Sequence, residues 1–217
     1  MILEVLLKNV PKNITNNNTY LINNKLFRHI YITMLKLINN DKTDKNTTHS
    51  YIELYEELLH KKRLTARNIL EIGIQRGGSI KLWHDYFINA TIYGLDIIPL
   101  TETWDKIRCE PRIKLGRFDA YDETFFINNF LEKIKFDMML DDGPHTLESM
   151  IQFIELYTQV MADDGILIIE DVQSMEWINK LIQAVPEHLK KYVSTYDLRH
   201  IKNRYDDIVF VINKQTN

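Results

Sequence analysis

From Asn68 onward the chain alternates short apolar runs with amphipathic segments, and this alternation limits the possible folds most. The apolar runs predict strands over residues 68–72, 91–96, 112–115, 136–140, 166–169, 192–198 and 208–212. Helices are expected over residues 79–87, 123–134, 146–161 and 175–184. Strands that alternate with helices form right-handed crossovers and a mainly parallel sheet. Only a charged loop joins the last two strands, which indicates a terminal hairpin. The predicted fold class is therefore α/β, with a mostly parallel seven-stranded sheet and a C-terminal antiparallel hairpin.

Two amphipathic segments precede this pattern. Residues 20–39 and 49–61 have apolar residues at helical spacing, and residues 39–48 form a polar loop between them. We therefore predict an N-terminal helical extension, residues 1–60, and a sheet-forming domain, residues 61–217. The extension is not needed to complete the sheet, so we expect it to support self-association or to cover the site at the sheet edge.

Composition and charge exclude several classes of protein. The 217 residues have a net charge of −3 and contain no basic stripe, which argues against a nucleic-acid partner. No run approaches the ~20 apolar residues that a membrane-spanning helix needs. The single Cys109 fits a reducing compartment, and the apolar run at residues 1–7 is too short for a signal peptide and contains Glu4. We expect a cytoplasmic protein without a membrane partner.

An acidic pair follows each of two predicted strands, Asp141-Asp142 after residues 136–140 and Glu170-Asp171 after residues 166–169. Carboxylates are costly to bury, and ligands of open α/β sheets bind at the carboxyl ends of the strands. Asp142, Glu170 and Asp171 are therefore the predicted metal ligands. Oxygen ligands without a nearby cysteine favour Mg²⁺. The alternative is that Asp141 and Asp171 only cap the following helices.

His145 follows the first acidic pair and is the predicted general base. Near neutral pH, histidine can take a proton from a hydroxyl group. Coordination of that hydroxyl by a metal at Asp142 would lower its pKa, so a modest base suffices. The predicted catalytic residues are therefore His145 and Asp142. The alternative is a histidine with a purely structural role.

Residues 70–79 read as a strand, a glycine turn and the start of a helix. Gly73 and Gly77 permit the turn and let the backbone approach a ligand closely. A dinucleotide-binding turn requires glycine where this chain has Gln75, which disfavours NAD. Glu71 would repel phosphates but accept bonds from an amine-bearing ligand, and Asp96 is placed to accept both hydroxyls of a ribose. The alternative is a tight turn with no ligand.

With these residues the chain resembles a class I S-adenosylmethionine-dependent methyltransferase. Glu71-Ile72-Gly73 through Gly78, together with Asp96, carry this resemblance. Within that superfamily it resembles the metal-dependent sugar O-methyltransferases of the mycinamicin and demethylmacrocin type and the related cephalosporin hydroxylase/rhamnosyl O-methyltransferase group. This narrower resemblance to the sugar O-methyltransferases is carried by Asp141-Asp142-Gly143-Pro144-His145, Glu170-Asp171-Val172, Thr43-Asp44-Lys45 and His49-Ser50-Tyr51. The resemblance covers roughly residues 43–175, departs at Gln75, where the family has glycine, and includes no motif for the acceptor pocket.

The resemblance implies a Rossmann-like methyltransferase fold and a set of cofactor contacts. In the bound S-adenosylmethionine that the resemblance implies, the methionine part is surrounded by Glu71, Gly73, Gly77 and Ser79. Asp96 binds the ribose, and Asp119 faces the adenine amino group. Asp141 and Tyr51 are further cofactor contacts in this interpretation. Two alternatives remain open: Asp119 caps the helix that contains Glu123, and Tyr51, like His49, belongs to an ordinary helix start.

The resemblance further implies a function for residues 61–217, which become the S-adenosylmethionine-binding catalytic domain. We expect a Mg²⁺-dependent O-methyltransferase that acts on a sugar hydroxyl of a nucleotide sugar or a glycosylated molecule and forms a homo-oligomer. One alternative is a catechol or phenol O-methyltransferase with the same fold, since vicinal oxygens also chelate Mg²⁺. A second is a cofactor-binding protein without activity. The sequence does not identify the sugar or the hydroxyl group.

Overall fold

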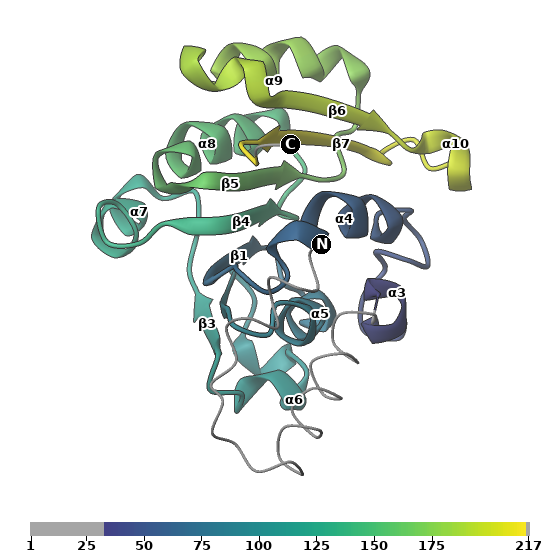
Figure 1. The fold of residues 1–217 in the computed structure, drawn as a ribbon, viewed down its shortest axis with the longest axis vertical. Coiled ribbons are helices and arrows are strands. Elements are labelled where there is room, and N and C mark those ends of the chain that lie inside the picture. Colours follow the sequence, from purple (N-terminus) through teal and green to yellow (C-terminus); the bar gives the residue numbers. More distant parts are fainter. Residues whose placement is uncertain (1–32, 216–217) are drawn as a thin grey trace, which may run out of the picture. The chain divides into compact units, whose positions relative to one another are not determined.

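The computed structural model describes residues 33–215, and a seven-stranded sheet lies at its centre (Figure 1). The spatial order of the strands is β3-β2-β1-β4-β5-β7-β6. Their bounds are β1 (Asn68–Ile72), β2 (Thr91–Asp96), β3 (Ile113–Arg117), β4 (Phe136–Asp141), β5 (Met161–Ile169), β6 (Val193–Asp197) and β7 (Ile208–Asn213).

The strand directions confirm the predicted fold class. β1 pairs in parallel with β2 and β4, and the pairs β2–β3 and β4–β5 are also parallel. β7 alone is reversed, because it pairs antiparallel with both β5 and β6. The sheet is therefore mostly parallel and ends in a C-terminal antiparallel hairpin.

The predicted helices after residue 48 are present, but the two predicted over residues 123–134 and 146–161 end earlier, at Asn129 and Tyr157, and Met161 begins β5. Their bounds are α3 (Met34–Leu37), α4 (Ile52–Leu59), α5 (Gly78–Tyr86), α6 (Asp105–Arg108), α7 (Glu123–Asn129), α8 (Leu147–Tyr157), α9 (Ile178–Ala184) and α10 (Arg199–Lys202). Short 3₁₀ turns occur at His60–Lys62, Leu100–Glu102, Thr158–Val160, Met175–Trp177 and Glu187–Tyr192. α6 and α10 were not predicted, because four residues are too few to show a helical period. The helix predicted over residues 20–39 lies mostly outside the described residues.

Helices cover both faces of the sheet (Figure 1). Successive strand residues point to opposite faces, so Ile69 joins one apolar layer and Leu70 the other. The first layer contains side chains from α3, α4, α5 and α6, and the second contains side chains from α7, α8 and α9. Because the central strands are buried on both faces, they read as continuous apolar runs.

The described part of the predicted N-terminal extension belongs to the first of these layers. Ile52, Tyr55 and Leu59 of α4 are buried there with Trp83 of α5. Residues 34–59 therefore contribute to the apolar core of the described structure. The assignment of residues 1–60 to self-association or to covering the site remains a prediction.

Strand register brings the candidate site residues to one edge. Ile72 of β1 is level with Leu95 of β2 and Asp141 of β4, and Asp141 is level with Ile169 of β5. The next residue on each strand is therefore Gly73, Asp96, Asp142 or Glu170. These four positions lie along the carboxyl ends of adjacent parallel strands, where α/β folds bind their ligands.

The helix-capping alternatives for three acids are wrong. The residue that caps α7 is Asp122, whose side chain accepts a bond from the Phe125 amide, so Asp119 does not. Thr146 caps α8 in a reciprocal arrangement with Ser149, which removes that role from Asp141. Ser174 caps the turn Met175–Trp177, so Asp171 is not its cap. No helix within residues 33–215 is both long enough and apolar enough to cross a membrane.

Candidate active site

A cavity of about 640 Å³ opens at the carboxyl ends of β1, β2 and β4, a size suited to a small-molecule or cofactor site. Six of the predicted site residues line it: Gly73, Asp96, Asp119, Asp142, His145 and Asp171. The others, Tyr51, Glu71, Gly77, Ser79, Asp141 and Glu170, do not line it. The structure thus divides the predicted site into a cavity wall and a buried layer behind it.

Glycine is required at the first turn because the neighbouring chain comes very close. Gly73 has a φ of +81°, and a Cβ atom there would lie 1.8 Å from the Asp142 carbonyl oxygen. Gly77, with a φ of +79°, is the N-cap residue of α5. The turn therefore lets the backbone after β1 lie directly against the backbone after β4.

Replacing Gly73 with alanine is expected to lower the free energy of unfolding by roughly 2–5 kcal/mol, the sum of left-handed strain and overpacking. The clash is with backbone, so the carboxylate of Asp142 must also move. Urea unfolding measures the loss. Gly165→Ala is the comparison, since Gly165 has no left-handed φ and its Cβ would be 3.0 Å from the nearest backbone atom, a tight but milder contact for which a smaller loss is expected. Equal stability of the two variants would contradict the prediction.

Asp96 is fixed at the end of β2 in an orientation that faces the cavity. Its two carboxylate oxygens accept bonds from the backbone amides of Gln75 at 2.8 Å and Ile98 at 3.1 Å. Each oxygen retains acceptor capacity for a ligand hydroxyl. Ile97 and Phe118 beside it are 69% and 52% exposed and line the same cavity. This wall therefore offers a hydroxyl acceptor next to an apolar surface suitable for a nucleoside base.

Asp119 lies in this wall but is partly engaged. One of its carboxylate oxygens accepts a bond from the Tyr121 amide at 3.0 Å, which turns the chain after β3. Acceptor capacity remains for an amino group in the cavity. The predicted position of Asp119 beside the adenine amino group is therefore compatible with the structure.

Asp142, His145 and Asp171 form a cluster in the part of the cavity lining that follows β4 and β5. Each offers one ligand atom, and these atoms all lie within 4.8 Å of one another. The Nε2 atom of His145 is 3.7 Å from Asp142 and 3.6 Å from Asp171. The predicted base and two of the three predicted metal ligands therefore meet at the cavity.

Backbone strain occurs at several residues that line the cavity. Gln75, His145 and Asp171 have φ values of 45°, 55° and 56°, in the left-handed region that side chains disfavour. All three line the cavity. Residues held in such conformations cluster at active sites, where the surrounding structure forces them into place.

Tyrosine hydroxyl groups contact three of the acids, of which Asp171 lines the cavity whereas Asp141 and Glu170 do not. The hydroxyl group of Tyr121 donates to Asp141, that of Tyr55 to Glu170 and that of Tyr51 to Asp171. Asp141 is 3% exposed and Glu170 is 2% exposed. The described contacts of Tyr51 and Asp141 are therefore with the protein, and their role as cofactor contacts remains a prediction.

Lys45 lies in the middle of the buried acids. Its Nζ atom is 2.7 Å from Asp142 and 3.7 Å from Glu71, and it also pairs with Glu170. Burial alone would lower the pKa of Lys45, but Asp142, Glu170 and Glu71 outweigh it and hold the pKa well above its usual value. The lysine is therefore a permanent cation in this cluster.

The same environment shifts the acids in different directions. Burial raises the pKa of Glu71 to about 7, although Lys45 opposes the change. Burial also raises the pKa of Asp142, and the charge of Glu170 adds to the effect. Burial would raise the pKa of Glu170, but the charge of Lys45 together with hydrogen bonds from Asp142, Lys45 and Tyr55 outweighs burial and lowers the pKa, so this carboxyl stays ionised. Glu71 accepts a bond from Trp83 Nε1 at 2.7 Å, and its contact with an amine-bearing ligand remains a prediction.

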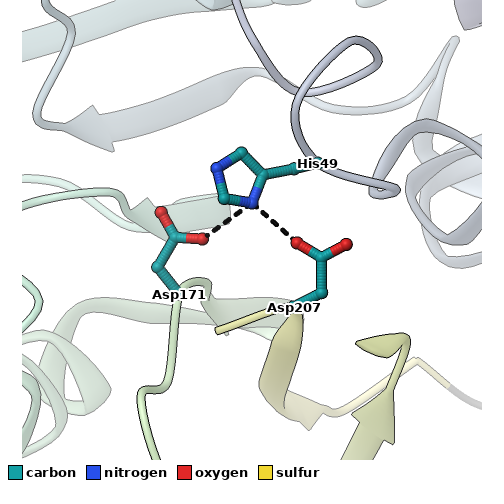
Figure 2. A group of neighbouring side chains, drawn as sticks. All are labelled: His49, Asp171 and Asp207. Carbon is teal, nitrogen blue, oxygen red and sulfur yellow. Dashed lines mark hydrogen bonds and ion pairs between the residues drawn. The ribbon is translucent and has the colours of Figure 1, made fainter. Parts of the chain in front are cut away.

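A second cluster joins the segment before α4 to β7 (Figure 2). His49 Nδ1 lies 2.7 Å from Asp207 and 3.2 Å from Asp171, and the carboxylates approach it from two sides. All three residues are buried. Asp171 therefore faces His49 on one side and His145 on the other.

Sequence reasoning missed Lys45, Tyr55, Tyr121 and Asp207 as parts of the site. The contacts of Lys45 join residues 97 and 125 positions apart in the chain, so no local periodicity reveals them. The one signal was that Lys45 stands in the segment that resembles the sugar O-methyltransferases. That resemblance did not indicate what Lys45 does in the site.

Comparisons with known proteins give the fold a name. No protein-family model matches the chain. Among solved structures, the MycE methyltransferase of the mycinamycin pathway, in complex with Mg and SAH, has a TM-score of 0.61 and 21% identity. The match covers 78% of this chain and 51% of that one. The chain has a Rossmann-like methyltransferase fold. The fibrillarin of Methanococcus jannaschii also matches, with a TM-score of 0.56 and 15% identity over 82% of this chain and 77% of that one.

The relatives of this methyltransferase-like chain are sugar O-methyltransferases, as the resemblance predicted. The 8-demethyl-8-alpha-L-rhamnosyl tetracenomycin-C 2'-O-methyltransferase of Streptomyces olivaceus is 28% identical over 62% of the chain. The mycinamicin VI 2''-O-methyltransferase of Micromonospora griseorubida is 29% identical over 64%, and the demethylmacrocin O-methyltransferase of Streptomyces fradiae is 30% identical over 59%. The matches cover 36%, 35% and 33% of these relatives, so the chain spans about a third of their length.

Proposed function

We propose that this protein is a Mg²⁺-dependent O-methyltransferase that moves a methyl group from S-adenosylmethionine to a sugar hydroxyl. The acceptor is a nucleotide sugar or a glycosylated small molecule. One observation carries the proposal: Asp142, His145 and Asp171 gather in the same cavity that Asp96 lines. A base, a set of metal ligands and a ribose acceptor thus surround one space.

The donor set fits a divalent ion. Asp142 and Asp171 present carboxylate oxygens to the cavity, and Glu170 adds negative charge directly behind them. Oxygen ligands of this kind favour Mg²⁺. When bound, Mg²⁺ would lower the pKa of a hydroxyl group that it coordinates. We propose Asp142, Glu170 and Asp171 as the acids that hold it.

His145 is proposed to take the proton of the acceptor hydroxyl at Nε2. That atom faces Asp142 and Asp171, so the proton acceptor lies beside the place where the hydroxyl oxygen binds. Both neighbouring carboxylates stabilise the imidazolium that forms. The oxygen then bonds to the methyl carbon, and the bond from that carbon to sulfur breaks. The cavity contributes by holding donor and acceptor in line.

The cofactor is proposed to lie along the carboxyl ends of β1 and β2. Asp96 accepts bonds from the ribose hydroxyls, Phe118 contacts the base and Asp119 faces its amino group. The turn at Gly73 lets the methionine part approach the backbone. MycE, which has the same fold, was solved with Mg, SAH and mycinamycin VI bound, and this supports a common site.

The proposal is tested by incubating the protein with labelled S-adenosylmethionine and a panel of nucleotide sugars and glycosides. We expect one sugar class to gain a single methyl group, detected by mass. A catechol arm tests the alternative acceptor. Methylation of catechol without methylation of any sugar would show that the acceptor is a phenol and not a sugar. Cofactor binding without transfer to any compound would favour a binding protein.

We also propose that residues 1–60 support self-association or cover the acceptor, and that the protein acts in the cytoplasm as a homo-oligomer. Support comes from Lys45, His49, Tyr51 and Tyr55, which join this segment to the acid cluster. Light scattering of the purified full chain measures its mass and decides the oligomeric state.

A further inference from the structure

Lys45 separates the acids of the site into two groups. The Oδ2 atom of Asp142 contacts the ammonium group at 2.7 Å, whereas the Oδ1 atom faces His145. Glu170 directs one oxygen to Lys45 and the other to the hydroxyl of Tyr55. Glu170 is therefore occupied by protein donors, while Asp142 Oδ1 and the Oδ2 atom of Asp171 remain on the side of His145.

The position of Lys45 is unusual for a lysine. It is 1% exposed, and three carboxylates from the ends of β1, β4 and β5 surround its ammonium group. Lysine is almost never fully buried unless it is paired. Like charges at this distance repel strongly, so without a cation the three acids would separate or take up protons.

We propose that Lys45 is a positioning residue of the ion site. Its ammonium group acts as a built-in counter-cation that keeps the acids assembled and competes with the divalent ion for their charge. This inference rests on the proposed function, because it concerns the affinity of the same ion site. Lys45 compensates part of the charge of Glu170 and turns Asp142 Oδ1 toward the cavity, so the ion is bound weakly and beside His145.

The proposal predicts a tighter ion site in Lys45→Met, which keeps the length of the side chain without its charge. Loss of one positive charge next to the acids is expected to lower the Kd for Mn²⁺ by about 10-fold or more. Turnover is expected to fall, because Glu170 becomes free to draw the ion away from His145. A titration followed by electron paramagnetic resonance measures the free Mn²⁺ directly and does not depend on activity.

Two controls separate charge from burial. Lys45→Arg retains the charge and is expected to bind Mn²⁺ as the wild type does. Lys62→Met removes another buried lysine, whose Nζ atom is 2.8 Å from Asp164 and which does not line the cavity. That variant is expected to lose stability without any change in Mn²⁺ affinity.

A double variant covers the case in which Lys45→Met does not fold. Lys45→Met with Glu170→Gln removes one charge of each sign and is expected to bind Mn²⁺ within a few-fold of the wild type. Weaker or unchanged binding in folded Lys45→Met, or binding at least about 10-fold weaker in the double variant, would overturn the role of Lys45. A wild-type protein that binds no Mn²⁺ would instead remove the proposed metal dependence, and this inference with it.

Discussion

Replacing His145 with alanine is expected to lower turnover by about 100-fold or more, as for a lost general base, with little change in cofactor affinity. The reason is the position of His145: its Nε2 atom lies 3.6 Å from Asp171 and 3.7 Å from Asp142, whereas Asp96 and Phe118 line the cavity at the ends of β2 and β3. Steady-state kinetics with the acceptor measures turnover, and calorimetry measures cofactor binding.

The loss of turnover in His145→Ala is expected to become smaller toward high pH, where solvent hydroxide can take the proton of the acceptor hydroxyl instead. His60→Ala is the matched control, since His60 is exposed and does not line the cavity. Near-normal turnover of the His145 variant between about pH 6 and 9 would make Asp142 the better candidate for the base. Loss of cofactor binding would show that His145 is a structural support.

Removing the divalent ion is expected to lower turnover by about 100-fold or more, because the acceptor hydroxyl then keeps its ordinary pKa. Chelation with EDTA, followed by addition of excess Mg²⁺, should abolish and restore methylation of the acceptor. Glu170→Gln removes one charge at nearly constant shape and is expected to raise the Mg²⁺ concentration needed for half-maximal rate. Product formation followed by mass measures both effects.

Folding is expected to change little when the ion is removed, because Lys45 already compensates part of the charge of the acids. Asp164→Asn is the matched control, since Asp164 is largely exposed and pairs with Lys62 outside the cavity. Activity that survives both EDTA and Glu170→Gln would show that these acids are structural. Thermal unfolding with and without EDTA separates loss of activity from loss of fold.

Several parts of the site followed from local sequence because they depend only on where a strand ends. The residue that ends or follows an apolar strand lies at the carboxyl edge of the sheet, so Asp96 and Asp142 were correctly placed there. The glycine requirement at residue 73 was also readable, although the atom that Gly73 approaches, the Asp142 carbonyl, was not.

Other residues were placed by contacts that no local pattern contains. Lys45 stands in a polar loop, where a lysine is normally solvated, yet it is buried among acids from three strands. Asp207 lies just before β7 but meets His49, a residue 158 positions earlier in the chain. Such pairs exist only because the crossovers bring these segments to the same place.

The sequence by itself determined the α/β class, the seven strands and the acidic strand ends. These features depend on hydrophobic periodicity and on the residue that follows each strand, both of which are local. The tertiary structure alone decided which carboxylates face the cavity. Asp142 and Asp171 reach it, whereas Glu71, Asp141 and Glu170 are buried behind it with lysine, tryptophan and tyrosine donors. The physical reason is that a buried charge is stable only where distant parts of the chain supply its partners.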